Sequence, residues 1–96
     1  MFKIRGAVNK IRSLSEDEKK AGVVAASAGN HAQGVALGAQ MFGVKATIVM
    51  PEQASLMKVQ ATKNYGAEVI LSGDYFDKAY ERAQELVKEK GLVLVH

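Results

Sequence analysis

The 96-residue sequence contains no cysteine, no tryptophan and only one proline. Without cysteine the chain has no disulfide scaffold and no thiolate metal site, which fits a reducing compartment. No apolar run approaches the roughly 20 residues that a membrane-spanning helix needs. The N-terminal segment is mixed and amphipathic, without the apolar centre of a secretory signal. We therefore expect a cytoplasmic protein that makes no membrane contact.

The sequence also lacks a strong excess of one charge, because 13 basic residues face 10 acidic ones for a net charge of +3. The mixed runs at residues 16–20 and 88–90 are typical of solvated helix faces. A basic stripe with interleaved aromatics, the usual mark of a nucleic-acid binder, is missing. The hydrophobic fraction of 48% is ordinary for a globular protein. Residues 1–96 therefore fit one compact domain that does not bind nucleic acid.

Four short apolar runs recur at nearly even spacing, over residues 23–27, 46–50, 68–71 and 92–95. Each run is too uniformly apolar to have one solvated face, which is typical of parallel strands covered on both sides. The segments between them have helical spacing. Because strand-helix-strand crossovers are right-handed, the pattern predicts a three-layer α/β/α domain with a four-stranded parallel sheet, Rossmann-like or flavodoxin-like.

Glycines and capping residues mark the ends of the predicted helices. A glycine stands just before each predicted strand, where a left-handed residue commonly ends a helix: Gly22, Gly43, Gly66 and Gly91. Ser15 with Glu18 has the spacing of a capping box, and Ser55 and Asp74 are suitable N-caps. The last helix has one apolar face, formed by Tyr75, Phe76, Ala79, Tyr80, Ala83, Leu86 and Val87.

The helix predicted over Asn30–Phe42 is almost uncharged and rich in glycine and alanine. A helix that is apolar on nearly every side is normally buried on every side. It either packs tightly on the sheet or is covered by another domain or a second copy of the chain. The chain opens directly on residues 2–6 and closes on a strand at His96 without an exposed linker. We therefore expect a domain excised from a larger two-domain protein.

Residues 27–34 follow the first predicted strand with the sequence Ser-Ala-Gly-Asn-His-Ala-Gln-Gly. Ligands of open α/β sheets bind beyond the carboxyl ends of the strands, and a helix start there attracts phosphate or carboxylate. The alternative is a simple N-cap in which Ser27 or Asn30 satisfies free amides. His31 is a candidate base or ligand, although a single histidine is more often structural, and His96 is a poor partner for it. We expect no metal site.

Lys3 is the other candidate for chemistry, since a neutral lysine amine forms a Schiff base with an aldehyde cofactor. A lysine near an N-terminus is more often simply solvated. The sequence contains no assignable Ser/His/Asp triad and neither of the two common glycine-rich phosphate loops. The residues alone therefore leave the chemistry open.

Three segments resemble the threonine dehydratases (threonine ammonia-lyases), which belong to the tryptophan-synthase-β-like class of pyridoxal-phosphate enzymes. They are residues 2–7, residues 14–16 and above all residues 25–34. Residues 46–51, 65–69 and 95–96 continue the resemblance, which covers nearly the whole chain. It implies a pyridoxal 5'-phosphate cofactor, a small amino-acid substrate, and β-elimination that yields a 2-oxo acid and ammonia.

The resemblance also implies a role for each residue of the site. Lys3 corresponds to the lysine that forms a Schiff base with the cofactor and takes the α-proton of the substrate. Phe2 corresponds to the residue packed on the pyridine ring, and Asn30 to the partner of the 3′-oxygen of the ring. The remaining members would line the pocket for the substrate carboxylate: Ser27, Ala28, Gly29 and His31.

Several features of the family are absent from the sequence. Met1 stands where the family usually has serine, and the glycine-rich phosphate loop and the hydroxyl residue facing the pyridine nitrogen are missing. Ala28 stands where serine racemases tend to have a hydroxyl, which favours a dehydratase. We therefore expect the isolated chain to lack turnover without its large domain. The alternatives are weak residual Schiff-base chemistry at Lys3, or an interaction module that self-associates through Asn30–Phe42.

Overall fold

The structure is a computed structural model that describes residues 2–27 and 29–95, with side chains from Arg5 onward. Its four strands form one parallel sheet in the order β3-β2-β1-β4, which confirms the predicted fold class. The elements along the chain are α1 (Phe2–Arg12), α2 (Glu16–Ala21), β1 (Val23–Ala26), α3 (Asn30–Phe42), β2 (Ala46–Met50), α4 (Leu56–Asn64), β3 (Glu68–Leu71), α5 (Phe76–Lys90) and β4 (Val93–Leu94).

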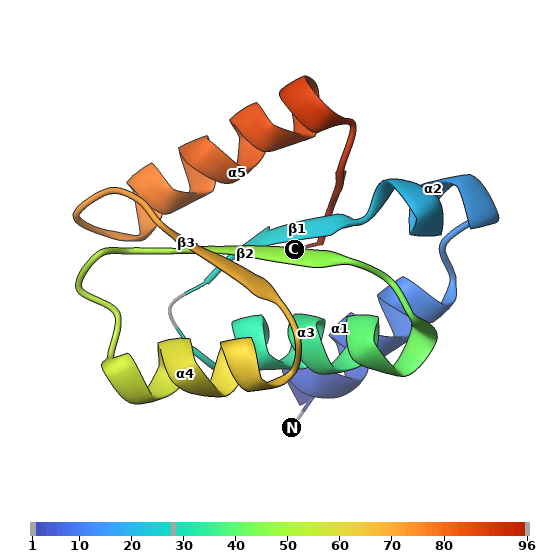
Figure 1. Cartoon of the computed structure of the whole chain (residues 1–96), viewed down its shortest axis with the longest axis horizontal. Coiled ribbons are helices and arrows are strands. Elements are labelled where there is room, and N and C mark those ends of the chain that lie inside the picture. The colour runs from blue at the N-terminus through green and yellow to red at the C-terminus, as the bar shows by residue number, and fades with distance from the viewer. Residues whose placement is uncertain (1, 28, 96) are drawn as a thin grey trace.

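Helices cover both faces of the sheet (Figure 1). The first, third and fourth helices lie on one face and α5 lies on the other. Alternate residues of β1 enter the two cores, with Val23 on the side of α3 and Val24 on the side of α5. Since both faces of the central strands are buried, their uniformly apolar sequences follow directly from their position.

The predicted strand ends need small corrections. β1 ends at Ala26, although the main-chain N–H of Ser27 still donates to the carbonyl of Val49 at 3.1 Å. β4 is confined to Val93–Leu94, and it pairs with β1 alone. As an edge strand it is only partly buried.

The predicted helix signals are mostly confirmed. Ser15 and Glu18 form a full capping box, and the hydroxyl of Ser55 accepts from the N–H of Lys58 at 3.2 Å. The four glycines that precede the strands all have positive φ. The prediction of Asp74 as an N-cap is wrong, because α5 begins at Phe76 with Tyr75 as its N-cap. Gly73 turns the chain at φ +84° so closely against the first turn of α5 that a β-carbon there would collide with Lys78.

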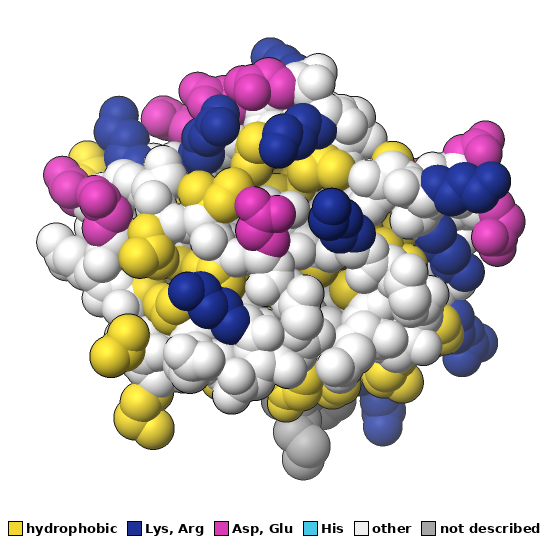
Figure 2. Space-filling view, viewed as in Figure 1, with side chains coloured by type: hydrophobic (Ala, Val, Ile, Leu, Met, Phe, Trp, Pro, Cys, Tyr) yellow, Lys and Arg dark blue, Asp and Glu magenta, His cyan; other side chains and the backbone are white. Residues whose placement is uncertain are grey.

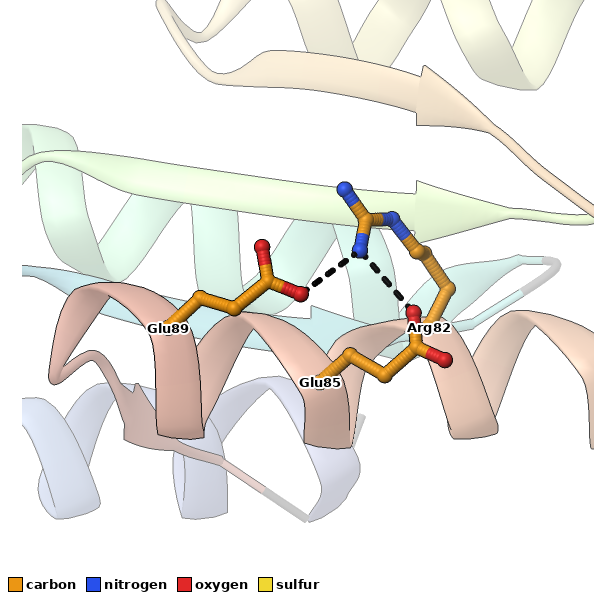
Figure 3. Close-up of polar contacts among 3 residues, drawn as sticks. All are labelled: Arg82, Glu85 and Glu89. Atoms are coloured by element: carbon orange, nitrogen blue, oxygen red, sulfur yellow. Dashed lines mark hydrogen bonds and ion pairs between the residues drawn. The ribbon is translucent and has the colours of Figure 1, made fainter.

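The apolar face of α5 is confirmed for its middle and wrong for its start. Ala79, Ala83 and Leu86 are buried against the sheet. Tyr75 and Phe76 are exposed, because they lie at the start of α5, beside the end of the sheet where β3 leaves it. The charged side of α5 carries a small ion-pair network (Figure 3), in which Arg82 Nη1 lies 2.9 Å from Glu85 Oε1 and 3.3 Å from Glu89 Oε2.

The ion-pair network shifts the pKa of Arg82. The hydrogen bond to Glu85 raises the pKa of the Arg82 guanidinium above its usual range, and the negative charge of Glu89 adds to this effect. Such exposed pairs stabilise a fold by little. The network therefore serves as a solvated helix face, as the mixed sequence pattern predicted.

Helix α1 was not expected from the sequence, and it explains the apolar character of α3. Gly38 of α3 lies so close to α1 that a β-carbon there would be 3.0 Å from Cδ1 of Ile11 and 3.2 Å from Cα of Val8. The helix α3 is thus enclosed between the sheet and α1, with Ala32, Val35, Ala36 and Ala39 buried. Met41, at its C-terminal end, is 59% exposed.

Candidate functional site

The candidate site lies at the edge of the sheet where the strands end, on the left in Figure 1. The loop after β1 leads into α3 there, and the loop after β2 leads into α4. Ligands of parallel α/β sheets bind at this edge. The predicted residues of the loop after β1 are therefore placed where the fold class expects a ligand.

The buried side chain of Ser27 stabilises the loop after β1 through hydrogen bonds. Its side chain is buried, at 6% exposure, and its hydroxyl oxygen accepts from the N–H of Gly29 at 3.2 Å and of Ala32 at 3.0 Å. Of the two residues proposed to satisfy free amides of the helix, Ser27 is the one that does so. Gly29 is the N-cap by position and has no side chain to cap with. The hydroxyl of Ser27 therefore holds the first turn of α3 in place.

The first turn of α3 also presents unused donors. Asn30 is exposed, and its side-chain amide has no hydrogen bond within the described part of the chain. The main-chain N–H groups of Asn30 and His31 likewise have no acceptor among the described residues. Free N–H groups at a helix start, together with the helix dipole, favour a bound anion. The turn thus offers main-chain donors and one amide to a ligand.

His31 is half-buried, and its contact favours a structural role over ligand binding. Its Nε2 lies 3.3 Å from the carbonyl oxygen of Val95, just beyond β4. This contact supports the interpretation of His31 as a structural hydrogen-bonding residue, because its Nε2 is engaged with the main chain. Within residues 2–27 and 29–95 no group of three or more potential metal ligands is found.

Lys58 was missed by the sequence analysis. A β-carbon at position 29 would lie 3.2 Å from Nζ of Lys58, so the ammonium group lies beside the loop after β1. Lys58 has no acidic partner among the described side chains. The available signal was Ser55, which predicts a helix start at the same edge of the sheet. A positive charge here adds to the attraction of the α3 N-terminus for an anion.

Phe2 and Lys3 form the first turn of α1, and their side chains lie outside what the structure describes, as does Ala28. The helices α1 and α3 pack side by side and run in the same direction (Figure 1). Their first turns therefore lie at the same end of this layer. The backbone brings the segment that carries Lys3 toward the segment that carries Asn30.

Exposed apolar side chains surround this edge. Figure 2 shows apolar atoms at the surface near the start of α4 and the start of α5. The large exposed residues there are Leu56, Met57, Leu71, Tyr75 and Phe76, with Leu56 at 81% and Met57 at 83% exposure. A separate pocket of about 210 Å³ lies near the start of β2, lined mainly by small residues and Tyr65. It is at the opposite end of the sheet from the loop after β1.

No helix in the described part of the chain is long and apolar enough to span a bilayer. Two sequence relatives place the chain in context. It is 64% identical over 95 residues to the L-threonine ammonia-lyase of Thermotoga maritima, with 99% of this chain and 24% of the relative covered. It is 57% identical to a catabolic L-threonine dehydratase of Staphylococcus aureus, with 99% of this chain and 28% of the relative covered. The chain thus spans about a quarter of the length of these relatives.

The solved structures similar to this chain include a threonine deaminase and a serine racemase. The processed form of threonine deaminase isoform 2 from Solanum lycopersicum superposes with a TM-score of 0.94 at 45% identity, covering 99% of this chain and 28% of that one. Maize serine racemase superposes with a TM-score of 0.93 at 41% identity, covering 99% of this chain and 29% of that one. A family profile described as "Pyridoxal-phosphate dependent enzyme" matches residues 2–96. The chain belongs to this family of pyridoxal-phosphate dependent enzymes.

Proposed function

We propose that this chain is the small domain of a cytoplasmic threonine or serine dehydratase and that it does not turn over substrate alone. The observation that carries the proposal is the loop at the start of α3, which offers unused N–H donors at the same end of its layer as the turn bearing Lys3. The identity of 64% with an L-threonine ammonia-lyase supports the same reaction class. The parent reaction converts a small hydroxy amino acid into a 2-oxo acid and ammonia.

The free donors of the α3 turn support a place for a pyridoxal group, and the resemblance assigns the other contacts to Phe2 and Lys3, whose side chains lie outside the described part of the chain. The cofactor supplies an aldehyde and an electron-withdrawing ring, which stabilise negative charge at the α-carbon of an amino acid. By the resemblance, Lys3 would provide the amine that holds the aldehyde, and its Nζ would take the α-proton. Phe2 would likewise pack on the ring, and the amide of Asn30, which is exposed, would donate to the 3′-oxygen.

The loop residues bind and orient the substrate carboxylate. The main-chain N–H groups of Asn30 and His31 donate to it, supported by the positive end of α3. Ser27 orients these donors through the hydrogen bonds that its hydroxyl accepts from Gly29 and Ala32, and Gly29 has no side chain to obstruct the carboxylate. The role of Ala28 stays a prediction, because Ala28 lies outside the described residues. The ammonium group of Lys58 adds attraction for the negative charge from the side of α4.

The partner in this proposal is the large domain of the parent enzyme. The apolar side chains at the carboxyl edge, such as Leu56 and Met57, fit contact with a further domain better than contact with water. Self-association through Asn30–Phe42 is the second candidate. Its support is weaker, because α1 covers much of α3 and leaves only Asn30 at one end and Gln40 and Met41 at the other exposed among the described residues of the helix. Sedimentation of the chain at high concentration separates the two, since self-association would give a dimer.

The site is tested by reducing the chain with borohydride in the presence of pyridoxal phosphate and mapping the modified lysine by mass spectrometry. We expect modification at Lys3 above all other lysines, and loss of that signal in Lys3→Ala. Lys10→Ala is the matched control, because Lys10 is an exposed lysine of the same helix. Labelling spread evenly over the lysines would contradict a site that this chain holds ready.

Turnover is tested separately by following 2-oxo acid formation from threonine and serine. We expect none from the purified chain, because the chain supplies only the binding groups of its own edge of the sheet. Turnover that disappears in Lys3→Ala would show that the chain is an active enzyme by itself and would overturn the proposal of an incomplete site.

A further inference from the structure

His31 joins two parts of the fold that are far apart in the sequence. Its Nε2 lies 3.3 Å from the carbonyl oxygen of Val95, across 64 residues of chain. Val95 is itself fixed, since it is 2% exposed and its N–H donates to the carbonyl of Val24 at 2.9 Å. The first turn of α3 is therefore connected through one imidazole to the segment that follows β4, and from there to β1.

The chemistry of this contact determines which nitrogen carries the proton. A carbonyl oxygen only accepts hydrogen bonds, so Nε2 of His31 must be the donor. In a neutral imidazole the other nitrogen, Nδ1, then has the free lone pair. Nε2 is consequently occupied and is not available to take a proton from a substrate or to bind its carboxylate.

We propose that His31 is a positioning residue that holds the first turn of α3 against the end of β4. This inference rests on the proposed function, because the turn it positions is the one that offers donors to the substrate carboxylate. Ser27 fixes the same turn from the side of β1, through its bonds to Gly29 and Ala32. The turn is therefore attached to the ends of two strands, β1 and β4. These attachments fix the direction in which its free N–H groups point.

The attachment matters because β4 is short and lies at the edge of the sheet. It is a two-residue edge strand paired with β1 alone, through the N–H groups of Val93 and Val95. The hydrogen bond from His31 adds a side-chain connection to this short strand. Loss of the imidazole donor should therefore loosen both ends of the contact, the turn of α3 and the end of β4.

Amide hydrogen exchange of the 96-residue chain, followed by NMR without any ligand, tests this role. The variants are His31→Gln, whose side-chain amide keeps an N–H donor, and His31→Met, which has similar length and no donor. In His31→Met we expect the amides of Ala32 and Val95 to exchange about fivefold faster, as for the loss of one ordinary hydrogen bond. In His31→Gln we expect both rates to stay within about twofold of the original chain.

The amide of Leu86, buried on the opposite face of the sheet, is the internal control. Unchanged rates in His31→Met, equal acceleration in both variants, or equal acceleration at Leu86 would each overturn the positioning role. A second readout is the ¹⁵N spectrum of the imidazole at about pH 8.5, where a free imidazole is neutral. We expect the proton on Nε2, and a proton found on Nδ1 would refute the inference.

These measurements contain neither cofactor nor substrate. A negative result would therefore remove the role of His31 and leave the proposed dehydratase site standing. Conversely, scattered lysine labelling would remove the proposed site and leave the connection between α3 and β4 intact.

Discussion

Replacing Gly38 with alanine tests the close packing of α1 on α3. The added β-carbon would lie 3.0 Å from Cδ1 of Ile11, 3.2 Å from Cα of Val8 and 3.4 Å from Cγ2 of Val8. The end of the Ile11 side chain can rotate, but Cα of Val8 belongs to the backbone. Relief of the contact therefore requires the whole of α1 to move outward by a few tenths of an ångström.

Two opposing terms decide the size of the effect. Alanine in place of glycine inside a helix stabilises it by about 1 kcal/mol through the lower entropy of the unfolded chain. Overpacking a well-packed interior costs about 1–3 kcal/mol. Because the obstacle is backbone, we take the cost near the middle of that range. We expect Gly38→Ala to lower the free energy of unfolding by about 1 kcal/mol.

Gly6→Ala is the matched control, because Gly6 lies in α1 and no described heavy atom is within 4 Å of its added β-carbon. There the helix term acts alone, and we expect a gain of about 1 kcal/mol. Urea unfolding followed by circular dichroism measures both. With a slope of about 1 kcal/mol per molar urea, the two midpoints should move about 1 M in opposite directions.

A third variant isolates the contact itself. Ile11→Val removes Cδ1, the atom nearest to the added β-carbon. In the original chain this change should cost about 1 kcal/mol, as usual for a buried isoleucine. In the Gly38→Ala background it should cost much less. If Gly38→Ala stabilises the chain as much as Gly6→Ala does, the close approach of the two helices is refuted.

Two further predictions concern the caps. Ser27→Ala leaves the N–H of Gly29 without its acceptor and removes one of the two acceptors of the Ala32 N–H, in a buried turn. It should therefore cost about 2 kcal/mol, against about 1 kcal/mol for the exposed cap in Ser55→Ala. Equal losses in urea unfolding would contradict the role of Ser27. Main-chain and side-chain hydrogen bonds with Ser15 lower the pKa of the Glu18 carboxyl below its ordinary value. A lowered pKa means stability that is present above the unfolded value and is lost as the pH falls through the folded value. The urea midpoint should therefore drop more steeply on acidification in the original chain than in Glu18→Gln, and parallel pH profiles would speak against this linkage.

The sequence by itself determined the parallel α/β architecture. The apolar runs at 46–50 and 68–71 became β2 and β3, and the helix Asn30–Phe42 has the bounds that its composition predicted. These features are local, because a strand buried on both faces, such as β2, must be largely apolar, and a helix commonly ends at a left-handed residue such as Gly43 or Gly91. Glycines and caps encode those needs within a few residues. β3 is an edge strand and is only partly buried.

Part of the site followed from the same local rules. The loop at 27–31 was predicted at the carboxyl edge because the edge is fixed by the order of strands and helices. Which residue would cap the turn was not decided, since Ser27 and Asn30 both carry suitable oxygens. The structure assigns the cap to Ser27, because its side chain is buried under the turn while that of Asn30 is exposed.

Only the tertiary structure decided the contacts between distant segments. Helix α1 packs against α3, and the mixed sequence of α1 does not predict this contact. Lys58 reaches Gly29 from another helix, and His31 reaches Val95 across 64 residues. Periodicity and caps describe the neighbours of a residue along the chain. A contact between segments depends instead on how helices pack across the sheet, which is settled when all of them bury their apolar faces together.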